Sequence, residues 1–145
     1  MKCITVYLFN NNLFFVPVSE TNDGAQFLTK PIFSTGILVD SEIIGEIIDN
    51  ALEASTILEI KPAKNTFKDL LKISGAKTHK LLVERGMAMS IDQKDNMLEI
   101  QLLKNAPEIK SFIGYDVPNI ISVERNAPNA ELGDIIKKLI LSNIT

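Results

Sequence analysis

Cysteine and histidine are each present only once in this 145-residue chain. Cys3 has no partner for an internal disulfide, which excludes a disulfide-stapled secreted domain. Together Cys3 and His79 supply too few ligands for a zinc or iron–sulfur site. His79 lies between lysines in KTHKLL, as is typical of a helix surface, and Cys3 lies among apolar residues, as is typical of an inert thiol. We therefore expect no metal site.

Sequence motifs for catalysis are missing as well. The chain contains no GxxxxGK[ST] or GxGxxG phosphate loop and no paired CxxC. A Ser-His-Asp or Cys-His arrangement needs a base beside a nucleophile, and only His79 is available as that base. The acids Asp92, Asp95 and Glu99 surround a turn without the ligand spacing of a calcium loop, which favours a solvated turn. These observations predict a protein that is not an enzyme and binds no cofactor.

Long hydrophobic runs and an excess of basic residues are absent too. The apolar run after Lys2 stops at Asn10-Asn11-Asn12, and no stretch reaches the roughly 18 apolar residues of a membrane helix. Hydrophobic residues make up 46% of the chain and charged residues 23%, as in an average soluble domain. The net charge of −3 disfavours a nucleic-acid binder. We expect one cytoplasmic domain, 1–145, with no membrane and no direct nucleic-acid contact.

The pattern of strands and helices predicts an α+β fold. The extended segments are two hairpins, 3–9 with 13–18 and 87–91 with 97–103 (turns at 10–12 and 92–96), and further stretches at 26–34 and 112–124. The helices are expected at 41–55, at 66–85 with a break at Gly75 and a cap at Thr66, and at 129–142. Pro17 suits a strand edge or end because it has no N–H donor. We predict an antiparallel sheet from two β-hairpins plus further strands, with the helices packed on one face.

Apolar periodicity within these segments predicts the core. Inward-facing positions on the strands alternate, and those on the helices recur at helical spacing. The core residues expected on this basis are Val6, Leu8, Phe14, Val16, Ile44, Ile47, Ile48, Leu52, Leu70, Leu71, Ile100, Leu102, Ile121, Leu132, Ile135, Ile136 and Leu139.

An internal echo relates the two ends of the chain at an offset of 88 residues. SEIIGEIID from Ser41 resembles NAELGDIIK from Asn129, and Gly45 coincides with Gly133. Either a unit of hairpin, strand and helix is duplicated, or two amphipathic helices simply share a composition. A glycine inside a helix costs about 1 kcal/mol and needs a reason such as close packing, which favours duplication.

Charge is segregated along the sequence. Positions 40–59 hold six acids and no base, whereas positions 61–80 hold six lysines and one acid. If the two segments pack together their charges partly neutralise each other; if not, the protein has an acidic and a basic ridge. One interpretation is that both charged segments are ordinary solvent-exposed helix faces without a binding role. The functional interpretations are a basic partner on the acidic stripe and, alternatively, phosphate or nucleic acid on the lysine-rich 61–80 segment. The acidic stripe is Glu42, Glu46, Asp49 and Glu53.

The order of these segments resembles the immunity proteins of bacterial contact-dependent growth inhibition systems. The resemblance spans nearly the whole chain and lies in Ser41–Leu52, in FKDLLKISGAKTHKLL from Phe67, in the 87–103 hairpin and in Glu131-Leu132-Gly133. It implies a cytoplasmic antidote that binds the toxin C-terminal domain delivered by a neighbouring cell. Such toxins are often nucleases, and their active site is occupied or covered by the immunity protein. Because nuclease sites are basic, the acidic stripe would then act as a substrate mimic.

Overall fold

The computed structural model describes residues 2–62, 65–115 and 119–143. The first predicted hairpin is confirmed as β1 (Cys3–Phe9) and β2 (Asn12–Thr21). Its turn consists of Asn10 and Asn11, whose φ angles of 51° and 61° are left-handed and suit asparagine. Asparagine therefore sets the register of this hairpin.

The second hairpin is formed by β6 (Met87–Lys94) and β7 (Met97–Leu102). Its turn is only Asp95 and Asn96, so the expected turn at 92–96 is too long. Asp92 lies in the strand because it pairs with Glu99 on β7 and with Cys3 on β1.

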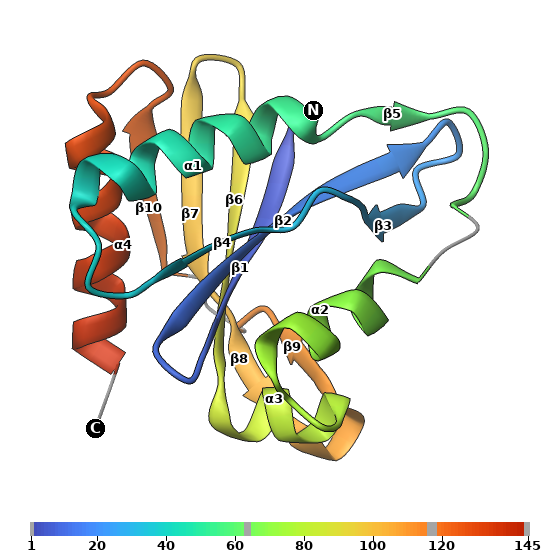
Figure 1. Ribbon diagram of the computed structural model, residues 1–145. Coiled ribbons are helices and arrows are strands. Elements are labelled where there is room, and N and C mark those ends of the chain that lie inside the picture. The colour runs from blue at the N-terminus through green and yellow to red at the C-terminus, as the bar shows by residue number, and fades with distance from the viewer. Residues whose placement is uncertain (1, 63–64, 116–118, 144–145) are drawn as a thin grey trace.

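The sheet has the order β10-β7-β6-β1-β2-β3, and β4 and β5 also pair with β2 (Figure 1). The predicted stretch 26–34 is divided into β3 (Gln26–Leu28) and β4 (Phe33–Gly36). β5 (Ile57–Leu58) lies parallel to β2, and β10 (Ile120–Glu124) is antiparallel to β7. A separate small hairpin consists of β8 (Lys104–Ala106) and β9 (Ser111–Ile113), joined by the 3-10 turn Pro107–Ile109.

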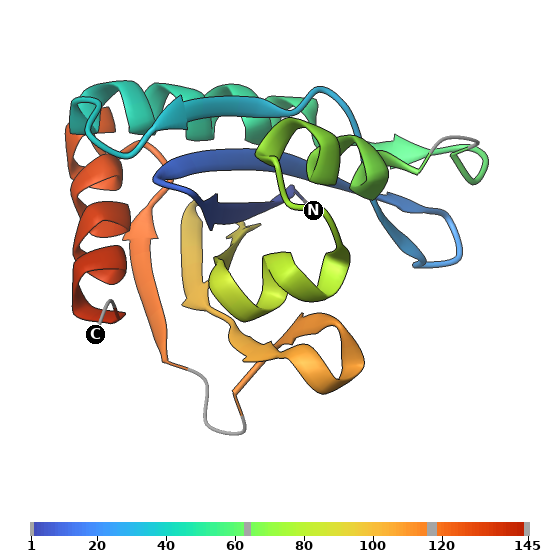
Figure 2. The ribbon, with the colours of Figure 1, turned by 60° about the horizontal axis from the view of Figure 1, so that its bottom comes forward.

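The helices cover both faces of the sheet, and the expectation of one covered face is wrong. α1 (Ser41–Ala54) and α4 (Asn129–Asn143) pack on one face. α2 (Thr66–Ser74) and α3 (His79–Arg85) pack on the other, as Figure 2 shows for α1 and α3. In the first hairpin, the strand residues of both faces are apolar and need covering.

Local signals place the break between α2 and α3 correctly. Gly75 has a φ of 82° and ends α2 in the left-handed conformation, as its position after the apolar run predicts. The cap of α2 is Asn65, whose side chain accepts a hydrogen bond from the Phe67 amide, and not Thr66. Both residue types are good caps, so the sequence alone does not choose between them.

Most of the predicted core is confirmed. Val6, Phe14, Val16 and Ile100 are buried with seven other predicted positions, and the remaining six are half-buried. The prediction misses residues that alternate with the expected ones, because two covered faces bury neighbouring strand positions together. Leu13 and Phe15 are missed in this way, and the buried residues Ile4, Met89, Ile91 and Leu98 are also absent from the prediction.

Pro17 lies within β2 rather than at its end, opposite Ile4. Its carbonyl accepts a hydrogen bond from the Thr29 amide on the side away from β1. Since the N–H and C=O positions of a strand residue point the same way, the missing donor also faces away from the β1–β2 ladder. The ladder therefore loses no hydrogen bond to this proline.

The two halves of the sheet have the same topology. Adding 85 to the residue numbers of β1 and β2 gives the register of β6 and β7, so the pair Val6–Phe15 corresponds to Ile91–Ile100. Adding 88 relates the following strand and helix, so β4 and α1 correspond to β10 and α4. The β1–β6 pair joins the halves antiparallel, as an approximate two-fold relation requires. Each half is the hairpin, strand and helix that the internal echo suggested.

The two matched glycines lie where α1 and α4 cross. A Cβ on Gly45 would clash with the backbone of Asn129, and a Cβ on Gly133 would clash with the backbone of Ser41. These contacts are reciprocal, since Asn129 and Ser41 are themselves equivalent residues of the two units. Close helix packing is thus the reason for both glycines.

Candidate functional site

The acidic stripe lies on the outer side of α1. Glu42, Glu46 and Glu53 are exposed, whereas Asp49 is half-buried. Helical spacing places these four carboxylates opposite the residues Ile44, Ile48 and Leu52 that the sheet buries. The structure therefore brings the four predicted residues to one surface, as their spacing requires.

Arg125 neutralises the C-terminal part of this stripe. Its Nη1 donates to Asp49 Oδ1 at 2.5 Å, its Nη2 lies 3.9 Å from Glu53 Oε1, and its Nε donates to Gln93. Arg125 follows β10, far from α1 in sequence, so periodicity gave no sign of this pairing. Glu42 and Glu46 form no ion pair within the described part of the chain and carry most of the unpaired negative charge.

Most of the lysine-rich 61–80 segment forms α2 and α3, which lie across the sheet from the acidic stripe, and none of its described lysines pairs with the stripe. Lys68, Lys72 and Lys77 are exposed on α2 and just after it. Lys80 pairs with Glu84 at 3.7 Å, on the exposed side of α3. Lys64 lies outside the described residues. Acidic and basic surfaces thus occupy opposite sides of the molecule.

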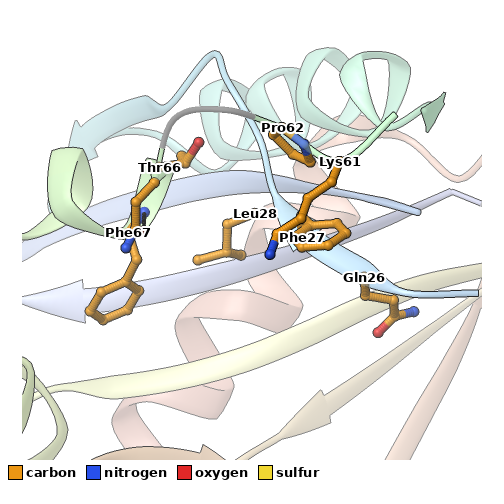
Figure 3. Close-up of a pocket in the computed structure, with 8 residues that line it drawn as sticks. Gln26, Phe27, Leu28, Lys61, Pro62, Thr66 and Phe67 are labelled. Carbon is orange, nitrogen blue, oxygen red and sulfur yellow. Dashed lines mark hydrogen bonds between the residues drawn. The ribbon is translucent and has the colours of Figure 1, made fainter. Parts of the chain in front are cut away.

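A hollow of about 430 Å³ lies between β3 and the start of α2. Figure 3 shows the aliphatic stem of Lys61 beside the Phe27 ring, with Lys61 Nζ 6.0 Å from the ring centroid. Leu28 and Phe67 line the other side of the hollow. Its lining combines apolar side chains and one lysine with the polar residues Gln26, Asn65 and Thr66, and the described residues place no pair of acidic and basic groups suited to catalysis there.

A second cavity, of about 260 Å³, has an aromatic wall. Tyr7 packs edge-on against Phe67 and Phe112, with ring centroids 6.5 and 5.9 Å apart, and His79 lies 4.0 Å from Phe67. Burial raises the pKa of the Tyr7 hydroxyl, and burial followed by the charge of Lys110 lowers the pKa of His79. Both groups are therefore neutral at pH 7. The lining is completed by Thr5, Leu103 and Ser111.

Cys3 is half-buried at the start of β1. Burial raises the pKa of its thiol, and the hydrogen bond and negative charge of Asp92 raise it further. A thiol is a poor nucleophile because only the thiolate attacks. Cys3 therefore has the chemistry of the inert residue that its apolar neighbours predicted.

Two comparisons with known proteins give no match: no family model and no curated protein matches this sequence. The fold does match solved structures. A protein of unknown function, NMB0488 from Neisseria meningitidis, aligns with a TM-score of 0.76 at 17% identity, over 99% of this chain and 95% of that one. A chain of the CdiA-CT/CdiI toxin and immunity complex from Yersinia pseudotuberculosis aligns with a TM-score of 0.77 at 14% identity, over 99% and 97%. The resemblance to contact-dependent inhibition proteins is thus confirmed at the level of fold.

The CdiA-CT/CdiI likeness concerns the whole architecture and identifies no contact residue. Within residues 2–62, 65–115 and 119–143, no three His, Cys, Asp or Glu side chains gather as a metal site would require. Over the same residues no helix is long and apolar enough to span a membrane. The surfaces described above are therefore the candidates for function.

Proposed function

We propose that this protein is an immunity protein that binds and neutralises the C-terminal toxin domain of a contact-dependent growth inhibition system. The proposal rests on the match in fold to a chain of a toxin and immunity complex, which covers 99% of this chain and 97% of the other. A fold retained over both full lengths at 14% identity agrees with a shared scaffold whose surface has diversified. The protein acts by binding and not by catalysis.

In this proposal the toxin is a nuclease and the immunity protein covers its active site in the cytoplasm of the recipient cell. A nuclease site is basic because it binds phosphate, and the exposed carboxylates of α1 are complementary to it. Such exposed charges act mainly on the rate of association. Glu42 and Glu46 provide most of the attraction, and Asp49 and Glu53 contribute less because Arg125 already pairs with both.

Co-expression tests the immunity role. The genes flanking the gene of this chain are searched for a large exported protein, and the C-terminal domain found there is produced with and without this chain, while growth and copurification are measured. We expect the domain alone to arrest growth, and co-expression to restore growth and give a stable complex. Continued arrest, with the two proteins eluting separately, would exclude the proposal. Degradation of RNA or DNA by the purified domain, and its inhibition by this protein, tests the nuclease step.

A charge variant tests the acidic stripe. The triple substitution Glu42→Gln, Glu46→Gln and Glu53→Gln is expected to slow association several-fold at low salt and to leave it unchanged at high salt. The matched control neutralises Lys68, Lys72 and Lys77 across the sheet and is expected not to slow association. An association rate and a salt dependence equal to those of the wild type would eliminate the stripe as the attractive surface, without affecting the immunity role.

A further inference from the structure

The sheet face that carries α2 and α3 is divided between the two halves of the fold. In the first half Tyr7, Phe14 and Val16 are buried beneath α2 and α3. Their counterparts in the second half are Asp92, Glu99 and Gln101, which are polar and only half-buried. Within the described residues, the chain therefore covers one half of this face and leaves most of the equivalent half uncovered, with Gly114 lying close to Gln101. We call the uncovered part the open sheet face; it consists of Thr5, Ser90, Asp92, Glu99, Gln101 and Ser122.

Two like charges face each other on the open sheet face. Asp92 and Glu99 are directly opposite on β6 and β7, an arrangement that destabilises a sheet. Lys94 lies 3.1 Å from Glu99 and compensates that carboxylate. Asp92 forms no ion pair with the residues that the structure describes, and Cys3 faces it from β1. A repulsive pair kept on an exposed part of a sheet is a local conflict of the kind expected at functional sites.

The open sheet face continues into the aromatic cavity. Thr5 lies opposite Ser90 in the sheet and also lines the cavity beside Tyr7 and Phe112. Ser90 and Asp92 are two residues apart on β6, which separates them by about 6.8 Å. Two side chains on the same side of an extended partner segment are separated by a similar distance, so one segment can contact both positions. The cavity, of about 260 Å³, has room for one apolar side chain.

We propose that the open sheet face and the aromatic cavity together hold a segment of the toxin domain. A basic side chain of that segment lies over Asp92 and Glu99, and an adjacent apolar side chain fills the cavity. This inference rests on the proposed function and adds the contact that holds the complex together, whereas the acidic stripe acts during approach. Contacts that desolvate charge mainly set the dissociation rate, and exposed charges set the association rate.

The experiment measures both rates for the purified toxin domain described above. The double substitution Asp92→Asn and Glu99→Gln removes two negative charges and keeps the shape of both side chains. We expect dissociation to accelerate at least tenfold while the thermal midpoint changes little, because the substitutions remove the repulsive pair together with the Lys94–Glu99 ion pair. The matched control, Glu42→Gln with Glu46→Gln, removes the same charge from α1 and is expected to leave dissociation unchanged.

A second variant tests the same surface without replacing Asp92 or Glu99, so that a folding defect of the double variant does not decide the result. Ser122 is exposed and lies opposite Glu99, so Ser122→Lys disturbs the fold little. The added lysine repels the basic side chain of the toxin segment, and we expect dissociation to accelerate as well. Wild-type dissociation rates in both open-face variants would overturn this inference and leave the immunity role standing. So would an equal acceleration in the α1 control, which would reveal a general charge effect. Failure of the wild-type protein to bind the toxin domain would overturn both proposals.

Discussion

The crossing of α1 and α4 supports a prediction about packing. Substituting Gly133 by alanine places a Cβ against the backbone of Ser41, where no side-chain rotation relieves the clash. The helices must separate, which loosens the buried contacts of Ile44 and Leu132. Overpacking of this kind costs about 1–3 kcal/mol and occasionally more. The gain in helix propensity offsets about 1 kcal/mol.

We place the overpacking cost of Gly133→Ala at the upper end of its range, because the obstacle is backbone, and expect a net loss of about 2 kcal/mol of unfolding free energy. For a domain of this size the loss lowers the melting temperature by about 6 °C. Urea unfolding followed by circular dichroism measures the free energy. Ala130→Gly, at an exposed position of the same helix, is the control and loses about 1 kcal/mol at most.

A double variant sharpens this test. Once one alanine has separated the helices, the second meets less resistance, so Gly45→Ala with Gly133→Ala is expected to cost less than the sum of the single substitutions. Additive losses would show that the two contacts are independent. A Gly133→Ala protein more stable than the wild type would refute the reasoning, because helix propensity would then outweigh the crossing.

Three further predictions concern single side chains. Arg125→Met removes the hydrogen bond to Asp49 and is expected to cost about 1–2 kcal/mol in urea unfolding, with Asp49→Asn losing less; equal stability would contradict a structural role for the pair. Because burial holds the pKa of His79 below its ordinary value of 6.5, the unfolded state binds more protons than the folded state as the pH falls through that value. Stability is therefore expected to decline from pH 7.5 to 5.5, less so in His79→Gln, and an NMR titration midpoint above 6.5 would oppose this. Cys3 is expected to react slowly with iodoacetamide at pH 8 and faster in Asp92→Asn, as followed by mass spectrometry; unchanged labelling would show that Asp92 does not influence the thiol.

Local chemistry made much of this fold predictable. Asn10 and Asn11 accept the left-handed conformation that a two-residue hairpin turn requires, and Gly75 ends α2 for the same reason. Helical spacing likewise placed Glu42 and Glu46 on one exposed face. These properties depend on a few consecutive residues, so the sequence alone carries them.

Tertiary structure decided which elements meet. Sequence periodicity did not reveal that helices cover both faces of the sheet, so neighbouring residues such as Leu13 and Phe15 were missed from the core. The pairing of Arg125 with Asp49 joins residues 76 positions apart, and the opposition of Asp92 and Glu99 depends on strand register. The glycines Gly45 and Gly133 indicated a close helix contact, but the sequence did not show that the two helices contact each other. The sequence by itself determined the local elements and the need for that contact. Only the packing of distant segments determined which half of the sheet stayed open, because burial depends on what the whole chain brings to each face.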